Sequence, residues 1–195
     1  MELLTGILSA FGLSASAGLN AYIPLLVIGV LAHYTKLIHL NSPWDTLANP
    51  WILILLGVLV CLEMLADKIP AVNHINDIIQ TFIRPAAGAV VFAASARVLT
   101  DIHPVLALAC GLLIAGSVHV VKAVAIRPAV TATTAGAGNV PVSIAEDVIA
   151  TITSILAIIM PYLVALVFIL VIVMMILWLR KRAINRRSLQ EDSLP

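Results

Sequence analysis

Charged residues are scarce in this sequence, and their scarcity excludes an ordinary soluble domain. Only 11% of the 195 residues are charged, whereas soluble domains have about a quarter of their residues charged. Hydrophobic residues make up 62% of the chain, and its mean hydropathy is +1.10. We therefore predict an all-α, polytopic helical membrane protein, with a single membrane domain over residues 1–180 and a cytoplasmic polar tail over 181–195.

Residue types that carry enzyme chemistry are also few. The two cysteines, Cys61 and Cys110, lie in apolar runs, which is typical of small buried side chains rather than of a disulfide or metal pair. The five histidines show no HExxH spacing, and no phosphate loop, nucleophile elbow or nucleic-acid motif is found. We expect no enzyme activity, no metal, no cofactor and, at a net charge of +1, no nucleic-acid partner.

About six apolar segments are predicted to form membrane helices. The first is longer than the roughly 20 residues that one span needs. Between the second and third, from Asp67 to Arg84, polar and apolar residues recur on opposite sides at helical spacing, which predicts an amphipathic helix lying at one membrane face. The segments are 3–34, 52–66, 85–98, 103–125, 144–159 and 161–179.

Two stretches look like breaks inside the membrane, Ser14–Asn20 and Thr131–Asp147. Each combines small residues with glycine, asparagine and a nearby proline, which disfavour a continuous helix. In the second stretch, Ser143 and Glu146 have the capping-box spacing that starts a helix. Paired breaks, which are either broken spans or re-entrant segments, are the best sequence indication of a transporter's binding site.

Basic residues predict the orientation of the chain. Five of them follow the last apolar segment, so we place the C-terminus in the cytoplasm. Alternating backwards along the segments then places nine of the eleven basic residues on the cytoplasmic side. This scheme leaves the N-terminus inside if the first segment spans once, and outside if that segment is re-entrant.

Ionisable residues at membrane depth mark the candidate site. Glu63 lies about 18 Å along its helix from Trp51, at about 1.5 Å per residue, and shares a helix face with Asp67, so that the two carboxylates can bind a cation or hold a proton. Glu146 and Asp147 have either a functional role or a capping role in a first helical turn. The candidate binding residues are Asn20, Glu63, Asp67, Lys68, Arg84, Arg127, Asn139, Ser143, Glu146 and Asp147.

Several of these candidates have a second interpretation. Asn20 and Asn139 can offer amides to a substrate or merely cap freed backbone groups. Arg84 and Arg127, each followed by proline, can bind an anion or reach to the interface as anchors. The sequence alone leaves both interpretations open.

A family resemblance rests on four short patterns in the chain. They are Glu63-Met-Leu-Ala-Asp67-Lys68-Ile-Pro70, Arg84-Pro85-Ala-Ala-Gly88, Arg127-Pro128 through Thr134, and Gly138-Asn139 with Ser143 to Glu146-Asp147. Together they resemble the bacterial membrane-protein family catalogued as domain of unknown function 4126, over nearly the whole chain up to about Leu179. The resemblance implies a multi-pass protein of the bacterial inner membrane with a shared site, and it implies no activity.

Three hypotheses for function follow. The first is a transporter or channel-like protein for a small solute or ion, with proton coupling as a variant. The second is translocation of a lipid whose anionic headgroup is held by basic residues at the inner face. The third is a membrane scaffold that does not transport, in which the charges pair off completely. Small residues in the segments 85–98 and 103–125 further suggest close helix packing and a homodimer.

Overall fold

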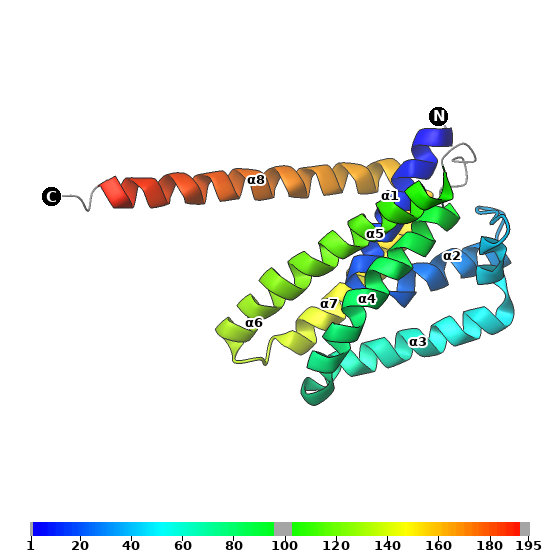
Figure 1. Cartoon of the computed structure of the whole chain (residues 1–195), viewed down its shortest axis with the longest axis horizontal. Coiled ribbons are helices and arrows are strands. Elements are labelled where there is room, and N and C mark those ends of the chain that lie inside the picture. The colour runs from blue at the N-terminus through cyan, green and yellow to red at the C-terminus, as the bar shows by residue number, and fades with distance from the viewer. Residues whose placement is uncertain (1, 96–102, 192–195) are drawn as a thin grey trace.

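The computed structural model describes residues 2–95 and 103–191, and these residues form helices with no strand among them. Five helices are long and apolar enough to cross a membrane, and α1 and α2 are shorter apolar helices. The all-α, polytopic prediction is confirmed. The elements are α1 (Glu2–Leu19), α2 (Tyr22–Tyr34), η1 (Trp44–Ala48), α3 (Pro50–Lys68), α4 (Pro70–Ser95), α5 (Pro104–Val121), η2 (Lys122–Ile126), α6 (Arg127–Thr134), α7 (Asn139–Ile159) and α8 (Pro161–Glu191) (Figure 1).

The elements α5, η2 and α6 form one continuous helix, Pro104–Thr134. Pro128 cannot donate a backbone hydrogen bond to the carbonyl four residues earlier, and the turn before it is a π-helix. There the N–H of Arg127 donates to the carbonyl of Lys122, five residues back. This widened turn lets the helix pass through the proline, and it places Lys122 and Arg127 beside each other at the same level of the bundle.

The helices α1 and α7 run in opposite directions. Near the end of α1, Ser16 Oγ donates to the Ala150 carbonyl at 2.8 Å. Near the start of α1, Thr5 Oγ1 lies 2.9 Å from the hydroxyl of Tyr162, just after the end of α7. The first turn of α1 therefore lies at the end of the bundle where α7 finishes.

The helix α2 runs antiparallel to α3. The break between α1 and α2 is buried in the bundle, where Asn20 is 1% exposed. At the start of α2, the Ala21 N–H donates to Glu63, in the second half of α3. Further along α2, a Cβ placed on Gly29 would meet the Leu53 side chain, near the start of α3. The end of α2 therefore lies beside Pro50, and α2 leaves the end of α1 on the side where α3 lies (Figure 1).

The apolar core fills the half of the bundle between the break and the Pro50 end. Its fully buried members include Leu13, Ile28, Val91 and Ala115. Small residues let α4 and α5 approach closely in this half, as predicted, because backbone of one helix touches backbone of the other. The small-residue faces on which a homodimer was predicted are therefore used within the chain.

Gly111 provides a stability prediction for the α4–α5 contact. A Cβ on Gly111 would lie 2.3 Å from the Gly88 carbonyl oxygen, whereas a Cβ on Gly57 would meet nothing within 4 Å. We expect Gly111→Ala to lower the melting temperature in detergent, because backbone must move, and Gly57→Ala to leave it unchanged. Equal melting temperatures for the two variants, measured by intrinsic fluorescence, would contradict the contact.

The separate interfacial helix predicted over 67–84 is wrong. From Pro70 the chain forms a single helix, α4, that continues through Pro85 to Ser95, and the predicted end at 96–98 lies outside the described residues. Its polar face is turned inward, with Gln80 only 2% exposed, whereas Phe82 is 76% exposed. A membrane surrounds the bundle with hydrocarbon, so apolar side chains face outward and polar ones find partners inside.

The second predicted break is a turn between two spanning helices rather than an interruption within one. Ala135 and Gly136 adopt positive φ angles of 52° and 89° between α6 and α7. The helix α7 begins at Asn139, not at Ser143. The predicted capping box is therefore wrong, and Glu146 is not in a first helical turn.

The helix α8 follows a sharp turn at Met160 and makes few contacts with the rest of the chain. Its first turns pack on α1, where Phe168 meets Phe11 edge to face at 5.9 Å between ring centroids. Beyond these contacts α8 extends away from the other helices (Figure 1). Residues 181–191 of the predicted polar tail continue this helix, and residues 192–195 lie outside the described part.

Candidate functional site

The helix break between α1 and α2 is capped by the side chain of Asn20, which lies within it. The helix α1 ends at Leu19 and α2 begins at Tyr22. Asn20 Oδ1 accepts hydrogen bonds from the N–H groups of Tyr22 at 3.2 Å and Ile23 at 3.1 Å. Asn20 Oδ1 thus caps freed backbone groups, as one of the two interpretations predicted. Asn20 Nδ2 does not bond to the backbone of the break.

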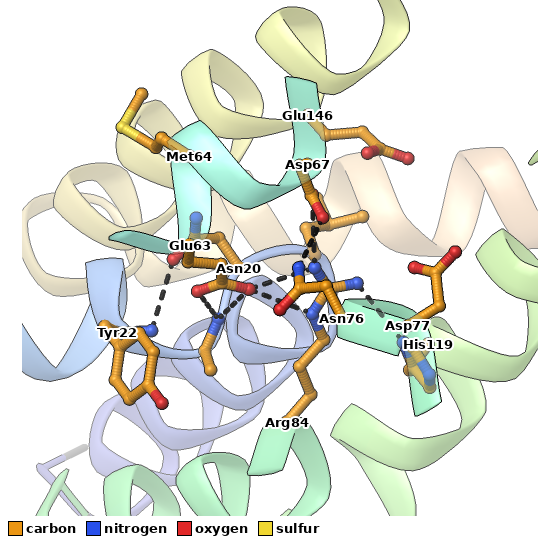
Figure 2. A network of polar contacts seen from close by, with 12 residues as sticks. Asn20, Tyr22, Glu63, Met64, Asp67, Asn76, Asp77, Arg84, His119 and Glu146 are labelled. Atoms are coloured by element: carbon orange, nitrogen blue, oxygen red, sulfur yellow. Dashed lines mark hydrogen bonds and ion pairs between the residues drawn. The ribbon is translucent and has the colours of Figure 1, made fainter. Parts of the chain in front are cut away.

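Polar side chains from three other helices hold this break. Glu63 of α3 accepts the Ala21 N–H at 3.1 Å (Figure 2). Lys122 of η2 donates to the Leu19 carbonyl at 3.0 Å. Asn20 Nδ2 donates to Asp147 Oδ1 of α7 at 3.0 Å. Ionisable groups therefore satisfy the backbone that the break frees on both sides of Asn20.

Glu63 and Arg84 form the deepest ion pair. Arg84 Nη2 and Nε lie 2.9 and 3.2 Å from Glu63 Oε1, and neither side chain has exposed surface. Arg84 Nη1 lies 3.2 Å from His119 Nδ1. Because a guanidinium only donates, this Nδ1 accepts, and His119 Nε2 carries the hydrogen that faces Thr81 Oγ1 at 3.2 Å. His119 is thus held as a neutral acceptor.

Asp67 lies one turn along α3 from Glu63 and contacts more cations than any other carboxylate described here. Its Oδ2 lies 3.0 Å from Arg127 Nη2, 3.5 Å from Arg84 Nη2 and 3.9 Å from Lys122 Nζ. The shared helix face of Glu63 and Asp67 is as predicted. A guanidinium nevertheless occupies the place between the two carboxylates where the sequence suggested a cation or a shared proton.

Two further ion pairs reach the surface at the Lys68 end of the bundle. Arg127 Nη1 lies 2.6 Å from Asp77 Oδ1, and Lys68 Nζ lies 3.3 Å from Asp147 Oδ2. The side chains of Lys68 and Asp77 are each 27% exposed. The charged side chains therefore extend from the buried Glu63 to these two partly exposed pairs at the Lys68 end of the bundle. Toward the Pro50 end, Glu63 is followed by the apolar core.

Glu146 is the least well bonded carboxylate. Its Oε2 lies 2.8 Å from Lys122 Nζ and 3.8 Å from Arg127 Nη2, yet neither oxygen has a hydrogen bond of acceptable geometry. Two other buried atoms in the described part of the chain also lack a hydrogen bond, Ser143 Oγ and Gln80 Oε1. Burial of a polar atom without a hydrogen bond is costly.

Seven of these residues are joined by ion pairs, and the Lys68–Asp147 pair is connected to them through Asn20 and Ala21 at the break. We call the nine residues the charge network. It contains five carboxylates and four cations, and Figure 2 shows the part around Glu63 and Arg84. If all are ionised, one negative charge is left uncompensated. The members of this charge network are Glu63, Asp67, Asp77, Glu146, Asp147, Lys68, Arg84, Lys122 and Arg127.

The structure brings most of the predicted site residues together, but not all. Asn139 lies at the α6–α7 turn, where it exchanges hydrogen bonds with Thr131 at 3.0 and 3.3 Å, and no described contact joins it to the charge network. Ser143 lies on α7 one turn before Glu146, and its Oγ has no hydrogen-bond partner.

Lys122, His119 and Asp77 were not among the candidate binding residues, although all three contact the others here. From the sequence, His119 and Lys122 can either relay protons or reach to the interface, and Asp77 falls in the segment predicted to lie at the membrane surface. Among the residues described, no group of three or more His, Cys, Asp or Glu side chains is arranged to hold a metal ion.

Comparison with known proteins identifies a family and no relative of known function. The family model described as domain of unknown function (DUF4126) matches residues 7–181. No curated protein and no solved structure matches the chain. The matched range contains the whole charge network and both ends of the α1–α2 break.

Proposed function

This chain belongs to the DUF4126 family, and from that premise we propose that it is a proton-coupled transporter of a small solute or ion in the bacterial inner membrane. The observation that carries the proposal is the charge network at the α1–α2 break. Ionisable groups within a membrane are costly and mark pathways for ions, protons or substrates. Broken helices at such groups are the usual construction of transporter binding sites.

The proposed topology has α1 and α2 as a re-entrant hairpin. The first turn of α1 and the end of α2 lie at the Pro50 end, and Asn20 lies between Glu63 and Asp147. The N-terminus is then outside and the C-terminus in the cytoplasm, because the basic residues of α8 follow its apolar part. In this arrangement the exposed pairs of the charge network face the cytoplasm, and the apolar core closes the site from outside.

The proposed mechanism couples the protonation of the charge network to the conformation of the α1–α2 break. Glu63, Lys122 and Asp147 each bond directly to the break, at Ala21, Leu19 and Asn20 respectively. A change in protonation within the charge network therefore alters the bonds that hold the ends of α1 and α2. In this proposal Glu63 and Asp67 are the coupling carboxylates, and the break, with the Asn20 amide, contacts the solute.

Lipid translocation is the weaker of the two other hypotheses, because the basic residues that would hold the headgroup already contact carboxylates. Arg84 and Lys122 are 0% and 1% exposed and already contact carboxylates, so they offer little to a headgroup. A scaffold role is favoured by one observation, the extensive pairing of charges. Against it stand the Glu146 Oε1 atom, which has neither a hydrogen bond nor an ion pair, and the excess negative charge, which a purely structural pair network does not need.

Reconstitution into liposomes tests the proposal directly. Amino acids, organic acids, sugars and monovalent cations would be added one at a time outside vesicles that contain a pH-sensitive dye. We expect at least one solute to drive proton movement with the wild-type protein. Glu63→Gln should abolish that movement, because it removes the charge opposite Arg84 while preserving the side-chain shape. Monodisperse elution and normal helicity of the variant would show that it is folded.

Two outcomes would contradict the proposal. One is the absence of proton movement for every solute in vesicles that contain folded wild-type protein. The other is equal movement with Glu63→Gln. A homodimer is also proposed as the assembly, and a monomer mass in detergent by light scattering would count against it.

A further inference from the structure

We propose that the Lys122 ammonium group occupies a binding site for a monovalent cation at the α1–α2 break, and that it keeps sodium and potassium ions out of this site. The site consists of three oxygen atoms, the Leu19 carbonyl, Glu146 Oε2 and Asp67 Oδ2. The inference rests on the proposed function only for its consequence, that protons rather than alkali cations drive transport. The occupancy of the site is a property of the folded chain and can be measured without any transport.

Three oxygens from three different helices surround the Lys122 ammonium group. Lys122 Nζ lies 3.0 Å from the Leu19 carbonyl oxygen, to which it donates a hydrogen bond. It lies 2.8 Å from Glu146 Oε2 and 3.9 Å from Asp67 Oδ2. The Lys122 side chain is 1% exposed, so these contacts replace its water. Backbone carbonyls and carboxylates are the ligands that hard cations prefer, and the ammonium group lies where these ligands converge.

The Leu19 carbonyl is a backbone group that the break makes available. Leu19 is the last residue of α1, and the carbonyls of a final helical turn lack partners within the helix. The helix dipole also favours a positive charge at this end. In transporters with broken helices, such carbonyls coordinate the coupling cation. In this chain, the side chain of Lys122 supplies the positive charge at that position.

The contact between Lys122 and Glu146 is electrostatic rather than directional. The two groups are 2.8 Å apart without a hydrogen bond of acceptable geometry. A lysine ammonium group acts as a compact point charge, as an alkali ion does, whereas an arginine guanidinium has donors in a fixed plane. Among the described residues, Glu146 Oε1 has neither a hydrogen bond nor an ion pair, although Glu146 is only 7% exposed. A metal ion, which can bind both oxygens of a carboxylate, would use this atom as well.

Charge balance predicts the effect of removing the ammonium group. The charge network has five carboxylates and four cations, so Lys122→Ala leaves five carboxylates and three cations. An uncompensated buried charge is destabilising, and alanine vacates the space that the lysine side chain filled. A sodium or potassium ion at the same oxygens restores the lost charge. In the wild type, such an ion would meet the ammonium group itself and be repelled.

Thermal unfolding of the full-length protein in phosphatidylcholine nanodiscs tests this proposal. Sodium or potassium chloride replaces choline chloride at constant ionic strength, which keeps the screening of surface charges unchanged. We expect the wild-type melting temperature to be the same in all three salts. Lys122→Ala should melt at a lower temperature in choline chloride, and its melting temperature should rise as sodium replaces choline, because a ligand that binds the folded state stabilises it.

Two further variants separate a specific site from a general charge effect. Lys68→Ala removes one positive charge from the same network at a site that is 27% exposed, but it leaves Lys122 at the Leu19 carbonyl. It should therefore show no sodium effect. Lys122→Ala/Glu146→Gln lacks one ligand of the site and has the same charge excess as the wild type. In equilibrium binding with radioactive sodium, we expect Lys122→Ala to bind one ion per chain and this double variant to bind none.

Several results would overturn the proposal. A wild-type melting temperature that depends on sodium would mean that Lys122 does not exclude the ion. Equal melting temperatures of Lys122→Ala in the three salts, or its failure to fold at any sodium concentration, would show that these oxygens do not bind an alkali cation. An equal sodium effect in Lys68→Ala would assign the effect to net charge. Sodium binding by Lys122→Ala together with a failed transport assay would remove the proposed function and keep the cation site.

Discussion

Replacement of Arg84 by Met should lower the free energy of unfolding by about 3–5 kcal/mol, the range found when one partner of a buried ion pair is removed. Arg84 and Glu63 have no exposed side-chain surface, and the guanidinium lies 2.9 Å from Glu63 Oε1. Removing it leaves the Glu63 carboxylate with only the Ala21 N–H. Thermal unfolding in detergent, followed by far-ultraviolet circular dichroism, measures the loss.

The matched control is Lys68→Met, which removes a cation of the same network from a site 27% exposed. Lys68 is partly solvated, and the buried Asp147 keeps its hydrogen bond from Asn20, so this variant should lose less stability than Arg84→Met. The double variant Glu63→Met/Arg84→Met should recover much of the stability lost in the single variant, because no buried charge is left unpaired. Equal losses of stability for Arg84→Met and Lys68→Met would contradict the prediction that burial determines the cost of removing one partner of an ion pair.

Glu63→Gln should uncouple transport from the proton gradient. In vesicles with the solute that moves protons in the wild type, we expect accumulation against a gradient to be lost completely. Exchange of labelled for unlabelled solute should continue, because glutamine mimics the protonated carboxyl and its amide oxygen can still accept the Ala21 N–H at the α1–α2 break. Measurement of accumulation and exchange on the same vesicles separates coupling from binding.

Asp147→Asn is the control for this second prediction. It changes the bonds to Asn20 and Lys68 and should slow both accumulation and exchange while keeping their ratio. If Glu63→Gln accumulates solute as well as the wild type does, another carboxylate carries the proton. If it loses exchange together with accumulation, Glu63 acts in solute binding rather than in coupling.

Much of the fold was predictable because membrane helices are local. Apolar runs of sufficient length predicted the helices that cross, and Asn20 was recognised as a break. The error over α4 has a clear cause. Polar residues on one face at helical spacing describe both a helix lying on a membrane and a helix that turns Gln80 and Arg84 inward, and periodicity does not distinguish them.

The site was predictable in kind rather than in pairing. A carboxylate at membrane depth must find partners, so Glu63 and Asp67 were recognised without any structure. Their partners come from α4 and from the long α5–α6 helix, at sequence separations that no spacing rule covers. Asn139 shows the opposite failure, because its resemblance to Asn20 was compositional and its actual bond is to Thr131 in a neighbouring turn.

The sequence by itself determined that this chain is a helical membrane protein with costly ionisable groups among its apolar segments, since composition and helix length depend only on neighbouring residues. Only the tertiary structure decided that Arg84 lies between Glu63 and Asp67, and that Glu146 is left without a hydrogen bond. The physical reason is that ion pairs and hydrogen bonds form between groups that lie a few ångströms apart in space, and helix packing sets those distances.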